Sequence, residues 1–141
     1  MAISQDDRAW AESARAQFPH LTSYGYGLPD GCGDNWKNPL SDECVEQIIV
    51  ARNFLTKMTF NKQVSHGSKT SYSSPTAIEL KTLISDLDGI YVHEGDIILA
   101  ASALGAPIRN YEAHHAQIGV SRRQYNAVKK VVDYNRTHLA Q

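Results

Sequence analysis

The side chains best suited to acid–base or metal chemistry in this chain are its six histidines. His114 and His115 are adjacent, so on most backbones their rings point in different directions. A zinc site needs a tetrahedral ligand set, and two histidines share one helix face when three residues separate them. The chain contains neither that spacing nor a Cys-x-x-Cys pair. The sequence therefore predicts no metal site.

Two histidine tripeptides, His20-Leu21-Thr22 and His66-Gly67-Ser68, resemble the paired His-x-Thr/Ser motifs of two-histidine phosphoesterases. That resemblance implies one histidine as general base, the other as general acid, and hydroxyls that hold the phosphate. In that family each tripeptide lies on an apolar strand, and neither flanking segment here has the alternation of a strand. A phosphoesterase is therefore the second alternative function, and two loop histidines are the simpler interpretation.

Cys32 lies between Gly31 and Gly33, with no neighbouring base or orienting group that would make it a nucleophile. We expect a small side chain packed under a loop. The glycines of this segment also lack the glycine-lysine spacing and the preceding strand of a phosphate-binding loop. The sequence therefore predicts no cofactor and favours a non-enzymatic protein.

The segment 20–40 combines glycines, prolines and aromatic residues without a helical or strand period. A loop of about 20 residues is uncommon inside a compact domain and is usually either functional or ordered by its own anchors. Its aromatic residues are Tyr24, Tyr26 and Trp36. Because Tyr and Trp dominate interface energetics, we predict these three as partner contacts. The alternative is that their rings cover the core.

Positive charge gathers toward the C-terminus: residues 1–46 carry a net charge of −5, and residues 47–141 carry +4. Arg122 and Arg123 are expected in the first turn of a helix, where the helix dipole disfavours cations. A phosphate or a partner's carboxylate would offset that cost. We predict both arginines, together with Arg109, as partner contacts. The simpler interpretation is that such arginines are solvated and pair with the acidic N-terminal half.

A helical framework positions these residues. Helical periodicity and capping residues predict helices over about 4–18, 41–58, 74–88, 96–104 and 121–139. The expected N-caps are Ser4, Ser41, Ser74 and Ser121, with Gln124 completing a capping box for the last helix. Gly89 and Gly105 are expected to end the third and fourth helices.

Tyr91–Gly105, YVHEGDIILAASALG, contains a short helix that is apolar on almost every side. Such a helix must be enclosed, so we expect the helices from Ser41, Ser74 and Ser121 to pack on it. Ile90–Val92 is expected to be an extended connector. The predicted fold class is all-α, with four or five helices around a short buried central helix and three long loops.

The composition is that of an ordinary globular protein, with 141 residues, 42% hydrophobic and 21% charged. We predict a single helical domain over 1–141, in which 1–40 form the first helix and the aromatic loop and 41–141 form the helical core. The N-terminus lacks the features of a secretory signal, and no apolar run approaches the roughly 20 residues that span a bilayer. We therefore expect a cytoplasmic protein of a bacterial host cell, without membrane insertion.

The order of several short motifs resembles a family of small uncharacterised helical proteins encoded by bacteriophages, plasmids and other bacterial mobile elements. The motifs are Thr70-Ser71-Tyr72, Leu80-Lys81, Tyr91-Val92 with Gly95, Ile98, Ala100-Ala101 with Gly105, and Ile118 with Ser121. The resemblance covers about residues 44–123 and carries no catalytic residues. It implies a setting in which small non-enzymatic proteins often bind and block a host factor, including CRISPR complexes.

The leading prediction is a non-enzymatic phage or mobile-element protein that binds and blocks a host protein or ribonucleoprotein complex, as an anti-CRISPR-like defence inhibitor does. The predicted partner contacts are Tyr24, Tyr26, Trp36, Arg109, Arg122 and Arg123. The alternative is a nucleic-acid-binding accessory protein that uses the basic C-terminal third.

Overall fold

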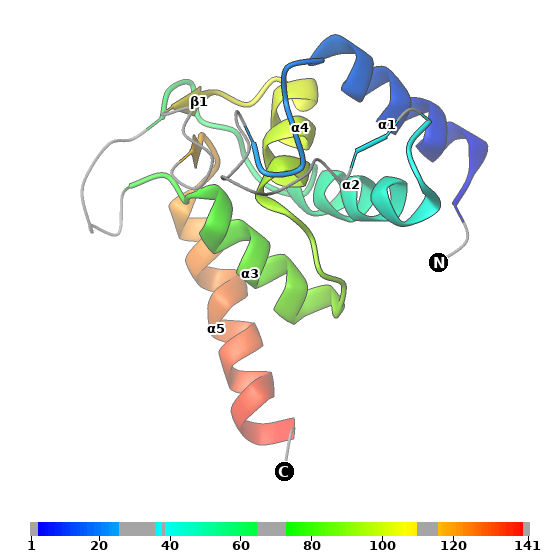
Figure 1. The fold of residues 1–141 in the computed structure, drawn as a ribbon. Coiled ribbons are helices and arrows are strands. Elements are labelled where there is room, and N and C mark those ends of the chain that lie inside the picture. The colour runs from blue at the N-terminus through cyan, green and yellow to red at the C-terminus, as the bar shows by residue number, and fades with distance from the viewer. Residues whose placement is uncertain (1–2, 26–35, 38, 65–72, 110–115, 140–141) are drawn as a thin grey trace.

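The computed structural model describes residues 3–25, 36–37, 39–64, 73–109 and 116–139. Within these ranges the chain forms helices and one small antiparallel sheet (Figure 1). The helices are α1 (Gln5–Gln17), α2 (Asp42–Leu55), α3 (Ala77–Asp88), α4 (Glu94–Leu104) and α5 (Arg122–Leu139). The strands are β1 (Ile108–Arg109) and β2 (Gln117–Ile118). The predicted all-α fold class is confirmed.

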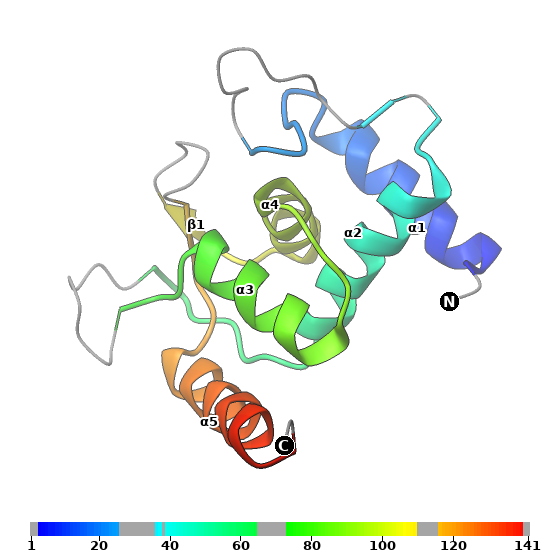
Figure 2. The same ribbon diagram turned by 60° about the horizontal axis from the view of Figure 1, so that its bottom comes forward.

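The helix α4 lies at the centre of the fold, with α1, α2 and α3 around it (Figure 2). Every residue from Glu94 to Ala101 is buried. Its most extensive contact is with α2, and α1 and α3 also pack on it. Since Ile97, Ile98 and Leu99 point to different sides of one helix and are all enclosed, the predicted buried central helix is confirmed.

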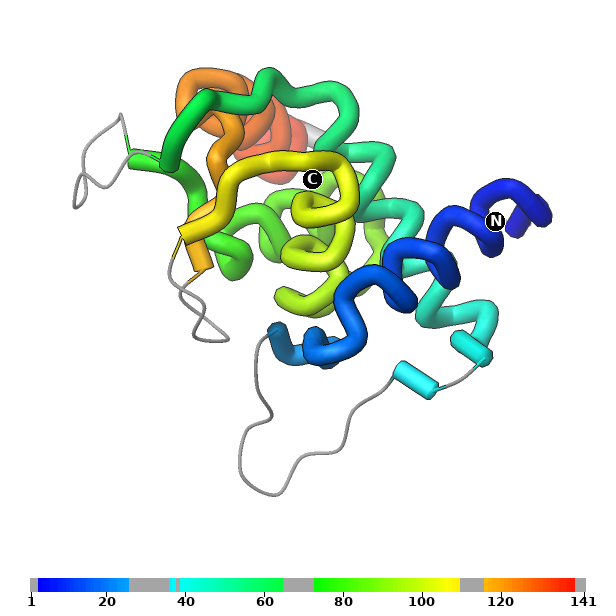
Figure 3. Tube along the Cα trace, turned by 90° about the horizontal axis from the view of Figure 1, so that it is seen from above, coloured from blue at the N-terminus to red at the C-terminus, as the bar shows by residue number. Residues whose placement is uncertain are grey.

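The last helix, α5, lies on the opposite side of the fold from α1 (Figure 3). It packs mainly against α3 rather than α4, and Arg136 of α5 forms an ion pair with Asp86 of α3 at 2.7 Å. The expectation that α5 packs on the central helix is therefore wrong. A helix of 11 residues is only about 16 Å long, and α1, α2 and α3 already cover it.

The first two helices begin as predicted. The Ser4 hydroxyl accepts a hydrogen bond from the amide of Asp7 at 3.0 Å, and the Ser41 hydroxyl accepts one from the amide of Cys44 at 3.2 Å. Both caps satisfy amides that have no partner inside their helix. α2 ends at Leu55, three residues earlier than expected, because the chain turns at Thr56.

The start of α3 differs from the prediction, because its N-cap is Thr76 and not Ser74. The Thr76 hydroxyl accepts from the amide of Glu79 at 3.2 Å, and the Glu79 carboxylate accepts from the amide of Thr76 at 3.1 Å. Pro75 lies before the helix, where its carbonyl accepts from the amide of Ile118 at 2.8 Å. This pairing with β2 holds Ser74 and Pro75 in an extended segment that local sequence does not reveal.

At α5 the predicted cap is confirmed and the predicted capping box is wrong. The Ser121 hydroxyl accepts from the amide of Gln124 at 3.2 Å. The Gln124 side chain does not turn back to Ser121; its oxygen accepts from the amide of Thr59 at 2.6 Å. The amide of Ser121 donates to the carbonyl of Thr59 at 3.0 Å. Tertiary bonds to the segment after α2 therefore replace the local one.

Glycines end α3 and α4 as expected, with φ of +70° at Gly89 and +86° at Gly105. α4 begins at Glu94, two residues before the expected Asp96, with His93 as its N-cap. Ile90–Val92 is an extended connector, as predicted.

The sheet was not predicted. Ile108 pairs with Ile118 and Arg109 pairs with Gln117 in antiparallel register. Two-residue strands carry too few residues to show an alternating pattern.

In the ranges that the structure describes, no helix has the length and apolar character needed to cross a bilayer.

Candidate functional site

The predicted aromatic contacts have different environments. Trp36 is buried, with 6% of its surface exposed, and its indole Nε1 donates to Oδ1 of Asp96 at 3.3 Å. Trp36 therefore covers the core and is not an exposed contact, which corrects its assignment. Tyr24 is partly exposed and meets the ring of His93 edge-on, with centroids 6.3 Å apart. Tyr26 lies outside the described residues.

The predicted basic contacts also divide. Arg109 on β1 and Arg123 on α5 are exposed, so both stay predicted contacts. Arg122 instead forms a bidentate pair with Glu79 of α3, at 2.8 and 2.9 Å. Its Nε donates to the carbonyl of Ser73 at 2.7 Å. The anion that offsets this first-turn arginine is thus Glu79, and the interpretation that Arg122 pairs with the acidic N-terminal half is wrong.

Arg122→Lys is expected to lower the free energy of unfolding by about 1 kcal/mol at neutral pH, because lysine cannot form the bidentate pair or the bond to Ser73. The hydrogen bond from Arg122 is the main cause that lowers the pKa of Glu79 below its ordinary value of 4.5. Stability from a depressed carboxyl pKa is present above 4.5 and is lost as pH falls through the folded pKa.

Urea denaturation of Arg122→Lys at neutral pH and near pH 3 measures this loss. The difference from the wild type should shrink as the pH falls through the folded pKa of Glu79. Arg123→Lys is the matched control, because Arg123 is the exposed neighbour and should lose almost nothing. Equal losses in the two variants would contradict the role given to the Arg122–Glu79 pair.

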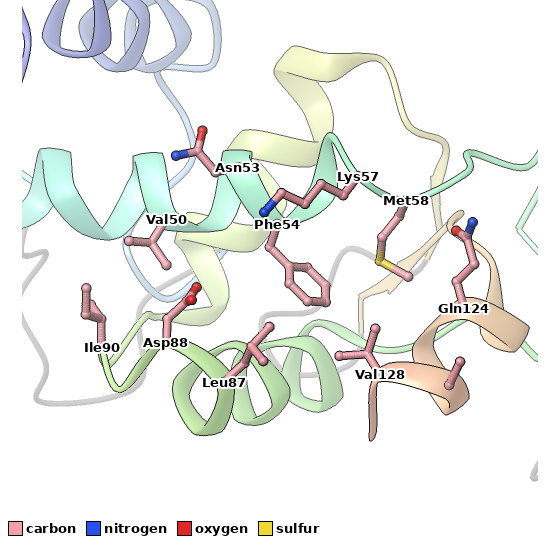
Figure 4. Close-up of a pocket in the computed structure, with 11 residues that line it drawn as sticks. Val50, Asn53, Phe54, Lys57, Met58, Leu87, Asp88, Ile90, Gln124 and Val128 are labelled. Atoms are coloured by element: carbon pink, nitrogen blue, oxygen red, sulfur yellow. The ribbon is translucent and has the colours of Figure 1, made fainter. Parts of the chain in front are cut away.

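An apolar groove opens between the C-terminal ends of α2 and α3 and the first half of α5, with a volume of about 540 Å³. It is lined by Val50, Asn53, Phe54, Lys57, Met58, Leu87, Asp88, Ile90, Gln124, Ala127 and Val128. In Figure 4, Phe54 and Met58 point from the α2 side toward Leu87 of α3 and Val128 of α5. This volume falls within the range of ligand-binding clefts.

The connections at both ends of α5 explain why the groove stays open. Thr59 holds the N-terminus of α5 through Ser121 and Gln124, while Arg136 ties its second half to α3. α2 ends at Leu55, and the chain turns at 56–58. α5 is thus fixed to α3 on one side and to the segment after α2 on the other, and the three helix ends leave a hollow between them.

Exposed apolar side chains extend the groove along α5. Val131 is 56% exposed and Tyr134 is 59% exposed. Val131 follows Ala127 by four residues and Val128 by three, so these side chains share one helix face. We call Ala127, Val128, Val131 and Tyr134 the α5 face.

The exposure of this surface was not predictable from the sequence. Helical spacing from Leu80, Leu83 and Ile84 puts Leu87 on the apolar stripe of its helix, and the structure leaves it 46% exposed. Either Val131 or Val132 could supply the next apolar contact of the last helix, and Val132 is the buried one, with 7% exposed. The helical period identifies an apolar stripe, but it does not show where the neighbouring helix that covers it ends.

A polar cluster, separate from the groove, lies at the start of α4. Asp96 is fully buried, and its Oδ2 accepts from the backbone amide of His93 at 2.8 Å. Burial raises the pKa of Asp96 above its ordinary value, against the bonds from His93 and Trp36 that lower it. The interaction with Asp96 is the main cause that raises the pKa of the His93 imidazole, whose Nδ1 lies 3.4 Å from Oδ2.

An aspartate that orients a histidine also occurs in catalytic triads. Here the aspartate oxygens hold the first turn of α4 and the Trp36 indole, so the cluster joins Trp36 to the central helix. Lys81 of α3 adds an ion pair to Glu94 at 3.2 Å. The cluster therefore fixes His93, whose ring contacts Tyr24.

The other candidate groups are placed as follows. His20 is exposed and the free thiol of Cys44 is buried. His66, His114, His115 and Cys32 lie outside the described residues. Among the side chains that the structure does describe, no three His, Cys, Asp or Glu residues are arranged to hold a metal ion.

Comparison of the chain with protein-family models, with curated proteins and with solved structures finds no match. The evidence on function is therefore the chain's own surface, and the groove with the α5 face is the candidate site.

Proposed function

We propose that this chain is a non-enzymatic binding protein that covers a surface of another macromolecule. The observation that carries this proposal is the groove together with the α5 face. Val131 and Tyr134 are more than half exposed, and they continue the apolar lining of the groove. Removing apolar surface of this kind from water is favourable by about 25 cal/mol per Å², and this gain opposes the entropy that association costs.

In the phage or mobile-element setting that the resemblance implies, the partner is a host protein or ribonucleoprotein complex, and blocking it is the function. An anti-CRISPR-like defence inhibitor would act in this way. Tyr24, Arg109 and Arg123 stay as further predicted contacts, because each is at least partly exposed. Trp36 is buried and its indole bonds to Asp96, so it is not among these contacts.

Affinity capture from a bacterial host lysate tests the proposal. Val131→Glu places a charge on the α5 face and is expected to reduce the captured partner at least tenfold, because burying an unpaired carboxylate opposes association. Ile78→Glu is the matched control, since Ile78 is an apolar residue of α3 that is 39% exposed and does not line the groove. Mass spectrometry identifies the partner.

Both variants must first show wild-type circular dichroism and urea denaturation. A partner captured equally well by Val131→Glu and by the wild type would refute this site. A partner that is lost equally in Ile78→Glu would show that general surface charge, and not the α5 face, controls capture.

A further inference from the structure

Cations border the groove on two sides. Lys57 lines it from the α2 side and is exposed. Arg123 and Lys130 are exposed on α5, four residues before and three residues after the lining residue Ala127, so helix geometry places both along the same edge. These three cations have no ion pair with another residue in the described ranges.

The remaining charges near this surface are mostly neutralised. Lys129 pairs with Asp133 at 3.0 Å, and Arg136 pairs with Asp86. Asp88, on the α3 side, is the carboxylate among the lining residues. The described surface therefore presents an apolar groove with an excess of unpaired positive charge along its α2 and α5 sides.

This combination fits one kind of occupant. Helix-lined apolar grooves take the apolar stripe of an amphipathic helix, whose residues recur every three or four positions. Cations that border such a groove attract a helix whose stripe is flanked by carboxylates and repel one flanked by lysines. Nucleic acid would use the cations but would leave Met58 and Leu87 uncovered.

We propose that the occupant of the groove is an amphipathic helix of a partner protein, with Asp and Glu residues on both sides of its apolar stripe. This inference rests on the proposed function and specifies the partner's chemistry. The acidic flanks would lie over Lys57 on one side and over Arg123 and Lys130 on the other. The unpaired cations then set specificity, and the apolar lining supplies affinity.

Two fluorescently labelled synthetic peptides of about 15 residues test this inference, each helical and with leucines at helical spacing. One carries glutamates on both flanks and the other carries lysines. Fluorescence polarisation with the full chain should show that the glutamate peptide binds about tenfold more tightly. The difference should nearly vanish at about 1 M salt, where the Debye length falls to ~3 Å.

Charge reversal is the decisive variant. Arg123→Glu with Lys130→Glu should remove or reverse the preference, whereas Lys37→Glu with Lys62→Glu, at exposed cations that do not line the groove, should keep it. Equal binding of the two peptides, or binding of neither, would overturn the inference. Displacement of the bound peptide by a single-stranded oligonucleotide would also overturn it, in favour of a nucleic-acid partner.

The outcomes separate this inference from the proposed function. If Val131→Glu abolishes lysate capture and the peptides are not discriminated, the binding function stands and the acidic-helix inference fails. If the peptides are discriminated and Val131→Glu captures its partner normally, the groove binds acidic helices but does not perform the proposed function.

Discussion

Gly95→Ala is expected to destabilise the protein by about 3 kcal/mol, although alanine is the better helix former. A Cβ atom on Gly95 would lie against the carbonyl oxygen of Thr22 and within 2.6 Å of the carbonyl oxygen of Ser23. Both obstacles are backbone atoms, so no side chain can rotate away. The helix-propensity gain of at most ~1 kcal/mol is smaller than the strain of such an overlap.

The backbone around Thr22 cannot easily retreat. The amide of Gly95 donates to the carbonyl of Ser23 at 3.0 Å, and Thr22 and Gly25 exchange backbone hydrogen bonds of 2.8 and 2.9 Å. Leu21 and Ser23 are fully buried. Moving this segment would therefore break bonds on both sides of it, and Tyr24 would lose its place beside His93.

Urea denaturation of purified Gly95→Ala measures the effect. Gly89→Ala is the matched control, because its Cβ would meet open space and only the left-handed φ of +70° opposes it. That backbone conformation costs alanine about 1 kcal/mol. A Gly95→Ala protein as stable as Gly89→Ala would show that α4 does not approach the 21–25 segment this closely.

Asp96→Ala is expected to cost roughly 2–4 kcal/mol, because it leaves one buried donor and one partly buried donor without their acceptor. These donors are the Trp36 indole Nε1 and the backbone amide of His93. Losing the first releases Trp36 from its anchor on α4, and losing the second removes the capping bond of the central helix. Asp96→Asn, which keeps one acceptor oxygen, should lose less.

The pH dependence of unfolding gives a second readout for Asp96→Ala. Because Asp96 raises the folded pKa of His93 above 6.5, the stabilisation that they share is complete below pH 6.5 and is lost as pH rises through the folded pKa. Burial raises the pKa of Asp96 itself, so its titration also lowers stability as pH rises above 3.8. Removing Asp96 should therefore flatten the fall in stability that begins above pH 6.5.

Asp6→Ala is the control for Asp96→Ala, since Asp6 is an exposed carboxylate in the first turn of α1. Its loss should cost only about 0.5 kcal/mol, through the helix dipole. If the two alanine variants lose the same stability, with the same pH profile, the hydrogen bonds of Asp96 do not stabilise the fold as described.

The sequence by itself determined the features that depend on neighbours a few residues apart. Ser4, Ser41 and Ser121 cap helices, and Gly89 and Gly105 end them, because these residues act on amides and carbonyls of their own turn. The burial of α4 was also predictable, since a helix that is apolar around its whole circumference must be enclosed.

Only the tertiary structure decided which partner a side chain takes when a distant one competes with a local one. Gln124 bonds to Thr59, 65 positions away, and so forms no capping box. Arg122 finds Glu79, 43 positions away, and so is not a free cation. The energies of the local and distant bonds are similar, so local spacing alone cannot rank them.

The exposure of the candidate site was decided by the tertiary structure alone. Leu87 and Val131 continue the periodic stripes of their helices, and nothing in those stripes distinguishes a covered position from an open one. Their exposure follows from where α2 ends and from how Thr59 and Asp86 fix α5. Periodicity records which face of a helix is apolar, whereas the packing of three helix ends decides how much of that face stays uncovered and able to bind.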